Sequence, residues 1–154
     1  MSWYLLTILL VGLLLLAAVV RLSPQSSRGR GGRRFSGGLA RRSLNSAQRQ
    51  TVADKWALVE SLIVVGRASS FQQAVVDADK LLDFTLKSLG ASGETTGDRI
   101  RSAESRFSDY SGVWTAHKVR NRLVHEEDFQ LLSHDTDRVI QQFRRALQDL
   151  GGLS

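Results

Sequence analysis

The sequence predicts an all-α protein: an N-terminal transmembrane helix, a flexible tether rich in Arg, Gly and Ser, and a bundle of four main helices and one short helix. The first 20 of its 154 residues carry no charged side chain. The next stretch, residues 21–49, contains eight Arg and no Asp or Glu. From residue 43 onward apolar residues recur at spacings of three and four, as in a helix, and no stretch alternates as a strand would. We therefore divide the chain into an anchor (1–21), a disordered basic juxtamembrane linker (22–42) and a helical domain (43–154).

Charge and cysteine content exclude several classes of protein. The formal net charge is +6, but residues 50–154 hold 13 basic and 15 acidic side chains, so the part able to fold is mildly acidic. A uniformly basic nucleic-acid-binding domain is therefore excluded. The absence of Cys excludes a disulfide framework, a Cys-ligated zinc site and a thiol nucleophile. With three His and no Cys, we expect neither a metal site nor a cofactor.

The uncharged segment at the start of the chain is predicted to be a retained membrane anchor. Residues 3–20 are 18 consecutive residues without a charge, dominated by Leu, which is just enough for a helix to cross a hydrocarbon core of about 30 Å. Trp3 and Tyr4 suit one interface, and Arg21 marks the other. A cleaved signal peptide, the alternative, needs a positive charge before the apolar run, where only the terminal amine lies. The positive-inside rule then predicts a single-pass protein with its N-terminus outside and its C-terminal domain in the cytoplasm.

The segment that follows is predicted to be a flexible tether. Residues 22–42 are rich in Ser, Gly and Arg, include the only Pro, and cannot bury enough apolar surface to fold. Its arginines suit anionic lipid at the membrane surface. The alternative is contact with RNA, because Arg/Gly-rich segments bind RNA without sequence preference.

Five helices are predicted from residue 43 onward. The first runs from a cap at Ser43 or Asn45 to about Val65, the second from a cap at Ser69 or Ser70 to Gly90, a short third from about Asp98 to Phe107, the fourth from Val113 to about His125, and the fifth from a cap at Ser133 to Gly151. We expect a loop over residues 90–97 and a turn over 108–112.

The fourth helix concentrates polar side chains in few residues. Its expected buried face is formed by Val113, Ala116, Val119 and Leu123. Arg120 lies near that face and therefore needs a partner, because an unpaired buried charge is costly. Asp79, beside the apolar face of the second helix, is the best candidate, and Asp83 is the next.

Three further polar residues of this helix, His117, Asn121 and His125, are spaced i, i+4, i+8 and are expected to form a row along the edge of the buried face. A purely structural interpretation makes Arg120 a salt-bridge partner and these histidines satisfied edge residues. The same side chains are also suited to a catalytic site, because His can donate and accept protons near neutral pH.

The segment RNRLVH, from Arg120 to His125, resembles the signature of the HEPN superfamily: an Arg, usually followed by a polar residue, with a His four to six residues after the Arg. The resemblance covers roughly residues 45–150. It implies a small all-α bundle with the motif on a late helix, and either a metal-independent endoribonuclease or a non-catalytic RNA-binding or scaffolding relative, commonly dimeric. The anchor and the tether depart from the typical soluble member.

In an enzyme of this kind the resemblance implies catalytic roles for Arg120, Asn121 and His125. His117, which has no place in the signature, and Asp79, the expected partner of Arg120, are candidates for supporting these residues without touching the substrate. His125 would transfer protons and Arg120 would stabilise the charge on the reacting phosphate. Residues five apart on a helix point about 140° apart, so one copy brings the two side chains together poorly. A two-fold homodimer, with His117, Asn121 and His125 at or beside the interface, is the simpler solution.

Two other classes remain open. One is a membrane-tethered interaction or dimerisation module that holds a protein partner without cleaving RNA. The other is a nucleotide-binding sensor, although the absence of G-x-x-x-x-G-K-[ST] excludes P-loop hydrolysis. An exposed cleft shared by Arg120 and His125 would favour the enzyme, whereas Arg120 sealed against Asp79 would favour the module.

Overall fold

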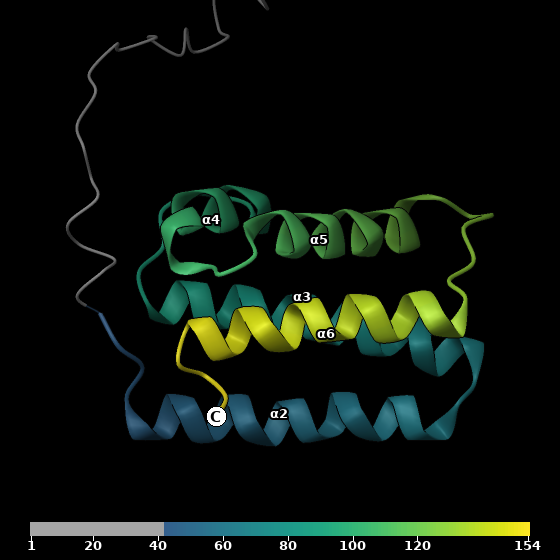
Figure 1. Ribbon diagram of the computed structural model, residues 1–154, viewed down its shortest axis with the longest axis horizontal. Coiled ribbons are helices and arrows are strands. Elements are labelled where there is room, and N and C mark those ends of the chain that lie inside the picture. The colour runs from purple at the N-terminus through teal and green to yellow at the C-terminus, as the bar shows by residue number, and fades with distance from the viewer. Residues whose placement is uncertain (1–41) are drawn as a thin grey trace, which may run out of the picture. The chain divides into compact units, whose positions relative to one another are not determined.

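The computed structural model describes residues 42–154, and this part of the chain is entirely helical, without strands (Figure 1). Its elements are α2 (Ser46–Val65), α3 (Ala68–Ser88), α4 (Thr96–Ser102), the 3-10 turn η2 (Glu104–Arg106), α5 (Tyr110–His125) and α6 (Ser133–Asp149). The predicted pattern of four main helices and one short helix is confirmed here.

The predicted anchor (residues 3–20) and most of the predicted tether lie outside the described residues. Among the helices of residues 42–154, none has both the length and the apolar character needed to cross a bilayer.

Helix α3 is the centre of the bundle. It packs against α2, α4, α5 and α6, and Figure 1 shows α3 and α6 between α2 on one side and α4 with α5 on the other. Apolar residues at spacings of three and four give α3 a continuous inward stripe, as predicted. The fully buried members of this stripe are Ala74, Val75, Ala78, Leu82 and Leu86. Asp79 is equally buried, so the central helix brings a carboxylate into the core.

The first helix has the predicted limits. Asn45 is its N-cap and forms a capping box with Gln48: the Asn45 side chain accepts from the Gln48 N–H at 2.8 Å, and the Gln48 side chain accepts from the Asn45 N–H at 2.9 Å. Gly66 ends α2 in the left-handed region, with φ of 71°, which costs Gly little.

Two predicted caps are wrong. Helix α3 begins at Ala68, so Ser69 and Ser70 lie inside its first turn, and the N-cap Arg67 makes no side-chain capping bond. This first turn is largely exposed, so water can satisfy its N–H groups. Ser133 is the first residue of α6 and not its cap, which is Leu132.

Two helices begin earlier than predicted, because acidic residues near their starts act as capping groups. Helix α4 starts at Thr96, since Thr95 and Asp98 form a capping box that makes Asp98 the third helical residue and not the first. Helix α5 starts at Tyr110, so only residues 108 and 109 of the predicted turn 108–112 form a turn; an oxygen of the N-cap Asp109 accepts from the Gly112 N–H at 2.9 Å.

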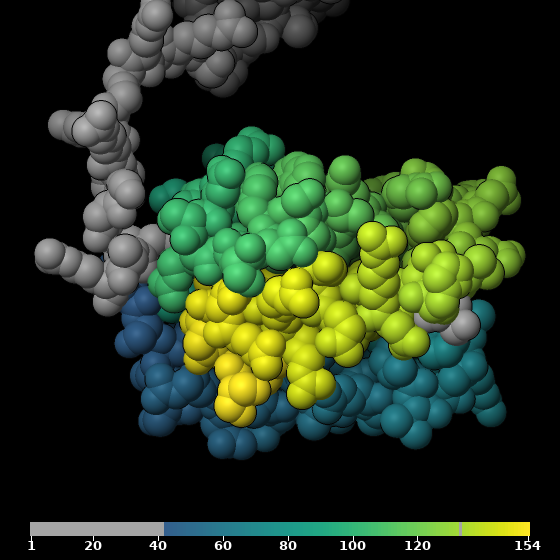
Figure 2. All heavy atoms as spheres, viewed as in Figure 1, coloured from purple at the N-terminus to yellow at the C-terminus, as the bar shows by residue number. Residues whose placement is uncertain are grey.

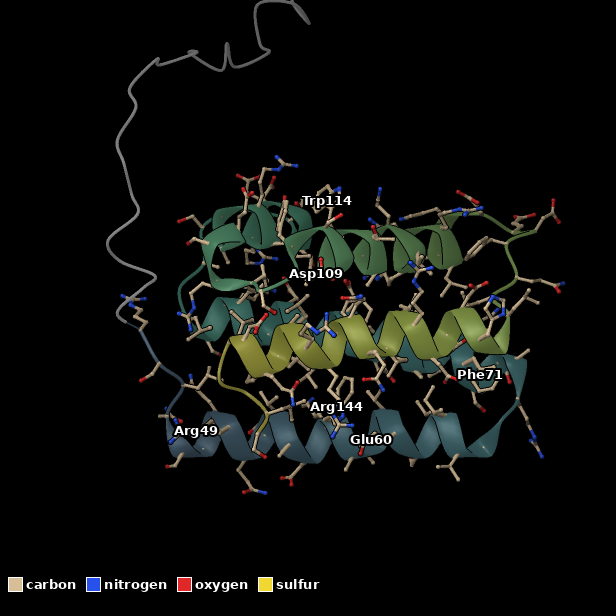
Figure 3. The ribbon with its side chains drawn as sticks, in the orientation of Figure 1. Arg49, Glu60, Phe71, Asp109, Trp114 and Arg144 are labelled. Carbon is tan, nitrogen blue, oxygen red and sulfur yellow. The ribbon has the colours of Figure 1, made fainter. Side chains whose placement is uncertain are left out.

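Helix α6 closes the bundle between α2 and α5. Arg144 of α6 reaches Glu60 of α2 (Figure 3), with Nη1 at 3.0 Å from Oε1. The same oxygen accepts from the indole N–H of Trp56 at 2.8 Å. On the face seen in Figure 2, α6 occupies the surface between α2 and α5. The exposed Arg144–Glu60 pair thus adds a polar contact between α6 and α2, which packs mainly against α3.

Candidate functional site

The candidate site lies where α5 packs on α3. Val113 and Ala116 are each 1% exposed, as predicted, while Val119 and Leu123 are only partly buried. His117, expected at the edge of the buried face, is only 6% exposed. His117 is therefore buried and not at an open edge, because α4 covers this side of α5. A Cβ added to Gly97 of α4 would lie only 3.5 Å from His117 Nε2.

Four polar side chains from α3 and α5 form a closed ring, which we call the Asp79 network: Asp79, His117, Arg120 and Asn121. His117 Nδ1 lies 2.7 Å from Asp79 Oδ1, and Asn121 Nδ2 lies 3.2 Å from His117 Nε2. Arg120 Nη1 donates to Asn121 Oδ1 at 3.0 Å, and Arg120 Nε lies 3.2 Å from Asp79 Oδ2. The predicted pairing of Arg120 with Asp79 is therefore present.

The contact between Arg120 and Asp79 is an ion pair without a hydrogen bond. Neither Arg120 Nε nor Asp79 Oδ2 has a hydrogen-bond partner within the described part of the chain, although both atoms are buried. The Asp79 side chain is 1% exposed and that of Arg120 is 24% exposed. The guanidinium thus neutralises a buried carboxylate from the rim of the core.

Only one assignment of donors and acceptors fits the Asp79 network. Arg has no acceptor, so the amide oxygen of Asn121 faces Arg120 and its NH₂ group faces His117. His117 Nε2 therefore accepts, and Nδ1–H donates to Asp79. Because its Nε2 lone pair is occupied by Asn121, neutral His117 offers no free base to a substrate.

An aromatic column extends the site toward α4. The rings of Trp114 and His117 have centroids 5.9 Å apart, and the rings of Tyr110 and Trp114 stack at 6.3 Å. The Arg101 guanidinium lies 5.5 Å from the centroid of Trp114. These contacts make Trp114 a packing residue that covers one side of His117.

His125 stands apart from the Asp79 network. It is the last residue of α5, and its side chain is exposed. Within residues 42–154 it makes no hydrogen bond or ion pair. Of the predicted row of His117, Asn121 and His125, all three residues lie on α5, but only His117 and Asn121 are joined by a hydrogen bond. Arg120 and His125 are not brought together within one copy, in keeping with their divergence of about 140° on a helix.

The second candidate partner of Arg120, Asp83, is paired with a residue that the sequence reasoning missed. Arg99 Nε lies 2.7 Å from Asp83 Oδ1, and Arg99 Nη1 donates to the Gly93 carbonyl at 2.7 Å. Lys87 Nζ lies 2.7 Å from the other oxygen of Asp83. Burial raises the pKa of Asp83, but bonds from Arg99, Lys87 and Thr96 outweigh it and hold the pKa below its usual value. The sequence signal that could have revealed Arg99 is its spacing from Ala103. Residues i and i+4 of a helix share a face, so Arg99 lies on the same buried face as Ala103 and needs a partner there.

The described residues show no grouping suited to a metal ion: nowhere in 42–154 do three or more His, Asp or Glu side chains gather. His134 is exposed and lies 3.0 Å from Asp135, through Nε2.

Comparison of the chain with models of known families, with curated proteins and with solved structures finds no match. The HEPN resemblance therefore stays a prediction from the RNRLVH segment of α5.

Proposed function

We propose that residues 43–154 are a HEPN-like, non-catalytic interaction module that binds a second copy of itself, held at the cytoplasmic face of a membrane by the predicted anchor. The observation that carries this proposal is the pairing of Arg120 with the buried Asp79. The motif arginine, which an enzyme would aim at a phosphate, serves here to neutralise a carboxylate in the core.

The energetics of the Asp79 network support a structural role. An RNA phosphate would have to share the charge of the Arg120 guanidinium with Asp79, and loss of one partner of a buried ion pair costs about 3–5 kcal/mol. His117 cannot replace it without breaking its own bond to Asn121. The network is thus better suited to fixing α5 on α3 than to binding and releasing a substrate.

The predicted topology supports a role at the membrane. The 18 uncharged residues and the eight arginines after them favour an anchor with the helical domain on the cytoplasmic side. A tether of residues 22–42, if it behaves as a flexible chain, spans about 25 Å on average. Confinement to one membrane raises the effective concentration of each copy for the other.

One observation favours a second function, metal-independent RNA cleavage. His125 is exposed at the end of α5 without a partner among the described residues, and its imidazole is therefore available for proton transfer. In this alternative a two-fold partner would supply the arginine that a single copy does not direct toward His125.

Incubation of residues 43–154 with bulk RNA in EDTA separates the two functions. The module predicts no cleavage above background and identical behaviour of the His125→Ala variant. Cleavage that resists EDTA and disappears in His125→Ala, while the variant melts like the wild type, would replace the module by the enzyme.

Sedimentation of the same protein at micromolar concentration tests its self-association. We expect a dimer. A strict monomer, both for residues 43–154 and for the full chain in detergent, would contradict the proposal.

A further inference from the structure

The outer face of α2 carries large apolar side chains that the bundle leaves uncovered. Leu58 is 66% exposed, Val64 86% and Val65 54%. The opposite side of the same helix is buried through Val52, Trp56 and Val59. An ordinary surface helix has one apolar stripe, whereas α2 is apolar on both sides. At 100° per residue Leu58 and Val65 share one side of α2, whereas Val64 lies about 120° away from Leu58. The exposed apolar side is therefore that of Leu58 and Val65.

The same face also contains a hollow. A groove of about 270 Å³ between α2 and α3 is lined by the apolar residues Leu58, Val59, Leu81 and Phe84, with Lys55, Asp77 and Lys80 around it. A protruding leucine thus lies directly beside an apolar hollow. A two-fold interface requires such a surface, because each copy must present both the knob and the hole.

Charges around the groove are also self-complementary. Lys55 has no ion-pair partner within the described residues. Asp77 pairs with Lys80 at 3.4 Å, but both side chains are well exposed, at 38% and 62%. The face therefore carries charges of both signs. The Lys55 ammonium of one copy can face the Asp77 carboxylate of a second, identical copy, so the surface is electrostatically compatible with itself.

We propose that the α2–α3 face, formed by Lys55, Leu58, Ser61, Asp77 and Phe84, is the surface through which two copies of this chain associate. The inference rests on the proposed function and names its partner surface. Two copies anchored in one membrane, as the proposed function has them, would each raise the effective concentration of the other.

This surface differs from the one expected from the sequence. The motif face was predicted at or beside the interface, but His117 is buried within one copy. Helices α2 and α5 lie on opposite sides of α3 and α6 (Figure 1). Association through α2 therefore leaves His125 outside the interface.

Cross-linking can test the surface in the full chain, in its membrane, because the chain has no Cys. Ser61→Cys places a single thiol on the exposed side of α2, one turn after Leu58. Thr115→Cys, on the exposed side of α5, is the matched control. A short bis-maleimide should yield a covalent dimer with Ser61→Cys and only the background of random collisions with Thr115→Cys.

A second substitution in the Ser61→Cys chain tests the apolar contact. Leu58→Glu should lower cross-linking about tenfold or more, the loss expected when a central apolar contact is replaced by a charge. Val124→Glu alters a similarly exposed apolar side chain on α5 and should leave cross-linking unchanged. Because Leu58 is largely exposed, the Leu58→Glu protein should melt like its parent.

The remaining outcomes overturn the surface in distinguishable ways. Cross-linking through Thr115→Cys alone would reject the α2–α3 face but keep a self-associating module. No cross-linking at either position, with a monomer in sedimentation, would reject both. A Ser61→Cys thiol that is shielded from maleimide yet forms no dimer would assign the face to lipid or to another segment, and not to a second copy.

Discussion

The imidazole of His117 and the carboxylate of Asp79, 38 positions apart in the sequence, meet in the core with Nδ1 and Oδ1 at 2.7 Å. Both side chains are almost fully buried. This bond joins α5 to the central helix α3 and gives the buried carboxylate a donor. It also aligns His117 so that Asn121, and through it Arg120, completes the ring. The shortest polar contact of the Asp79 network is thus a structural link between helices.

The two ends of the RNRLVH motif should differ in their effect on stability. Arg120→Ala leaves one oxygen of Asp79 without a counter-charge, while His117 still serves the other. We therefore expect a loss of about 2–4 kcal/mol in the free energy of unfolding. His125→Ala should cost less than about 1 kcal/mol, because the side chain is exposed. Urea unfolding of both variants measures this, and equal losses would contradict the network.

The Asp79 network predicts the tautomer of His117. Long-range ¹⁵N–¹H correlation should find the proton of the neutral ring on Nδ1, because Asn121 donates to Nε2. His134 is an internal reference, since its Nε2 faces Asp135 at 3.0 Å and favours the opposite tautomer. A proton on Nε2 of neutral His117 would mean that Asn121 is turned the other way and that the ring of contacts is broken.

Acid should weaken the packing of α4 on α3 through Asp83. Its pKa is lowered in the folded protein because bonds from Arg99 and Lys87 outweigh burial. The stabilisation is therefore present above the unfolded pKa of about 3.9 and is lost as the pH falls through the lower folded value. Asp83→Asn should lower the melting temperature at pH 7 and flatten its decline between about pH 5 and pH 2. An unchanged decline would exclude Asp83 as its source.

Gly93 should tolerate substitution far less than Gly151. Gly93 has φ of 132°, and an added Cβ would fall 2.3 Å from Asp98 Cβ and 2.9 Å from its carbonyl carbon. Gly151 also has positive φ, 74°, but a Cβ there meets nothing within 4 Å. We expect Gly93→Ala to cost about 2–4 kcal/mol and Gly151→Ala about 1 kcal/mol, measured by urea unfolding. Similar costs would contradict the tight turn before α4.

The predicted topology is testable in intact cells. Protease added from outside should leave residues 43–154 uncut, because the positive-inside rule, applied to the arginines after residue 20, predicts a cytoplasmic helical domain. The same protease should digest the domain after lysis. Cutting in intact cells, or a mature N-terminus after Val20, would contradict the anchor.

Much of the fold followed from local sequence patterns. The spacing of apolar residues predicted five helices, because a helix must turn one continuous apolar stripe inward wherever it packs. Asn45 and Gly66 marked the ends of α2, since side-chain capping and a left-handed Gly are decided within a few residues. The starts of α4 and α5 were predicted too late because two local capping groups were not recognised. Asp98 was predicted as the first residue of its helix and Asp109 as part of a turn, whereas both cap the starts of these helices.

The sequence by itself also determined that Arg120 needs a partner, and it named Asp79 as the best candidate, because a charge near an apolar face cannot remain unpaired. Only the tertiary structure decided which carboxylate goes to which cation. Arg99 takes Asp83 and leaves Asp79 to His117 and Arg120. That choice depends on the distances between α3, α4 and α5, which no spacing along one helix contains. The burial of His117 was likewise decided by the packing of α4 over it, because a helix period places a side chain on a face but does not say what covers that face.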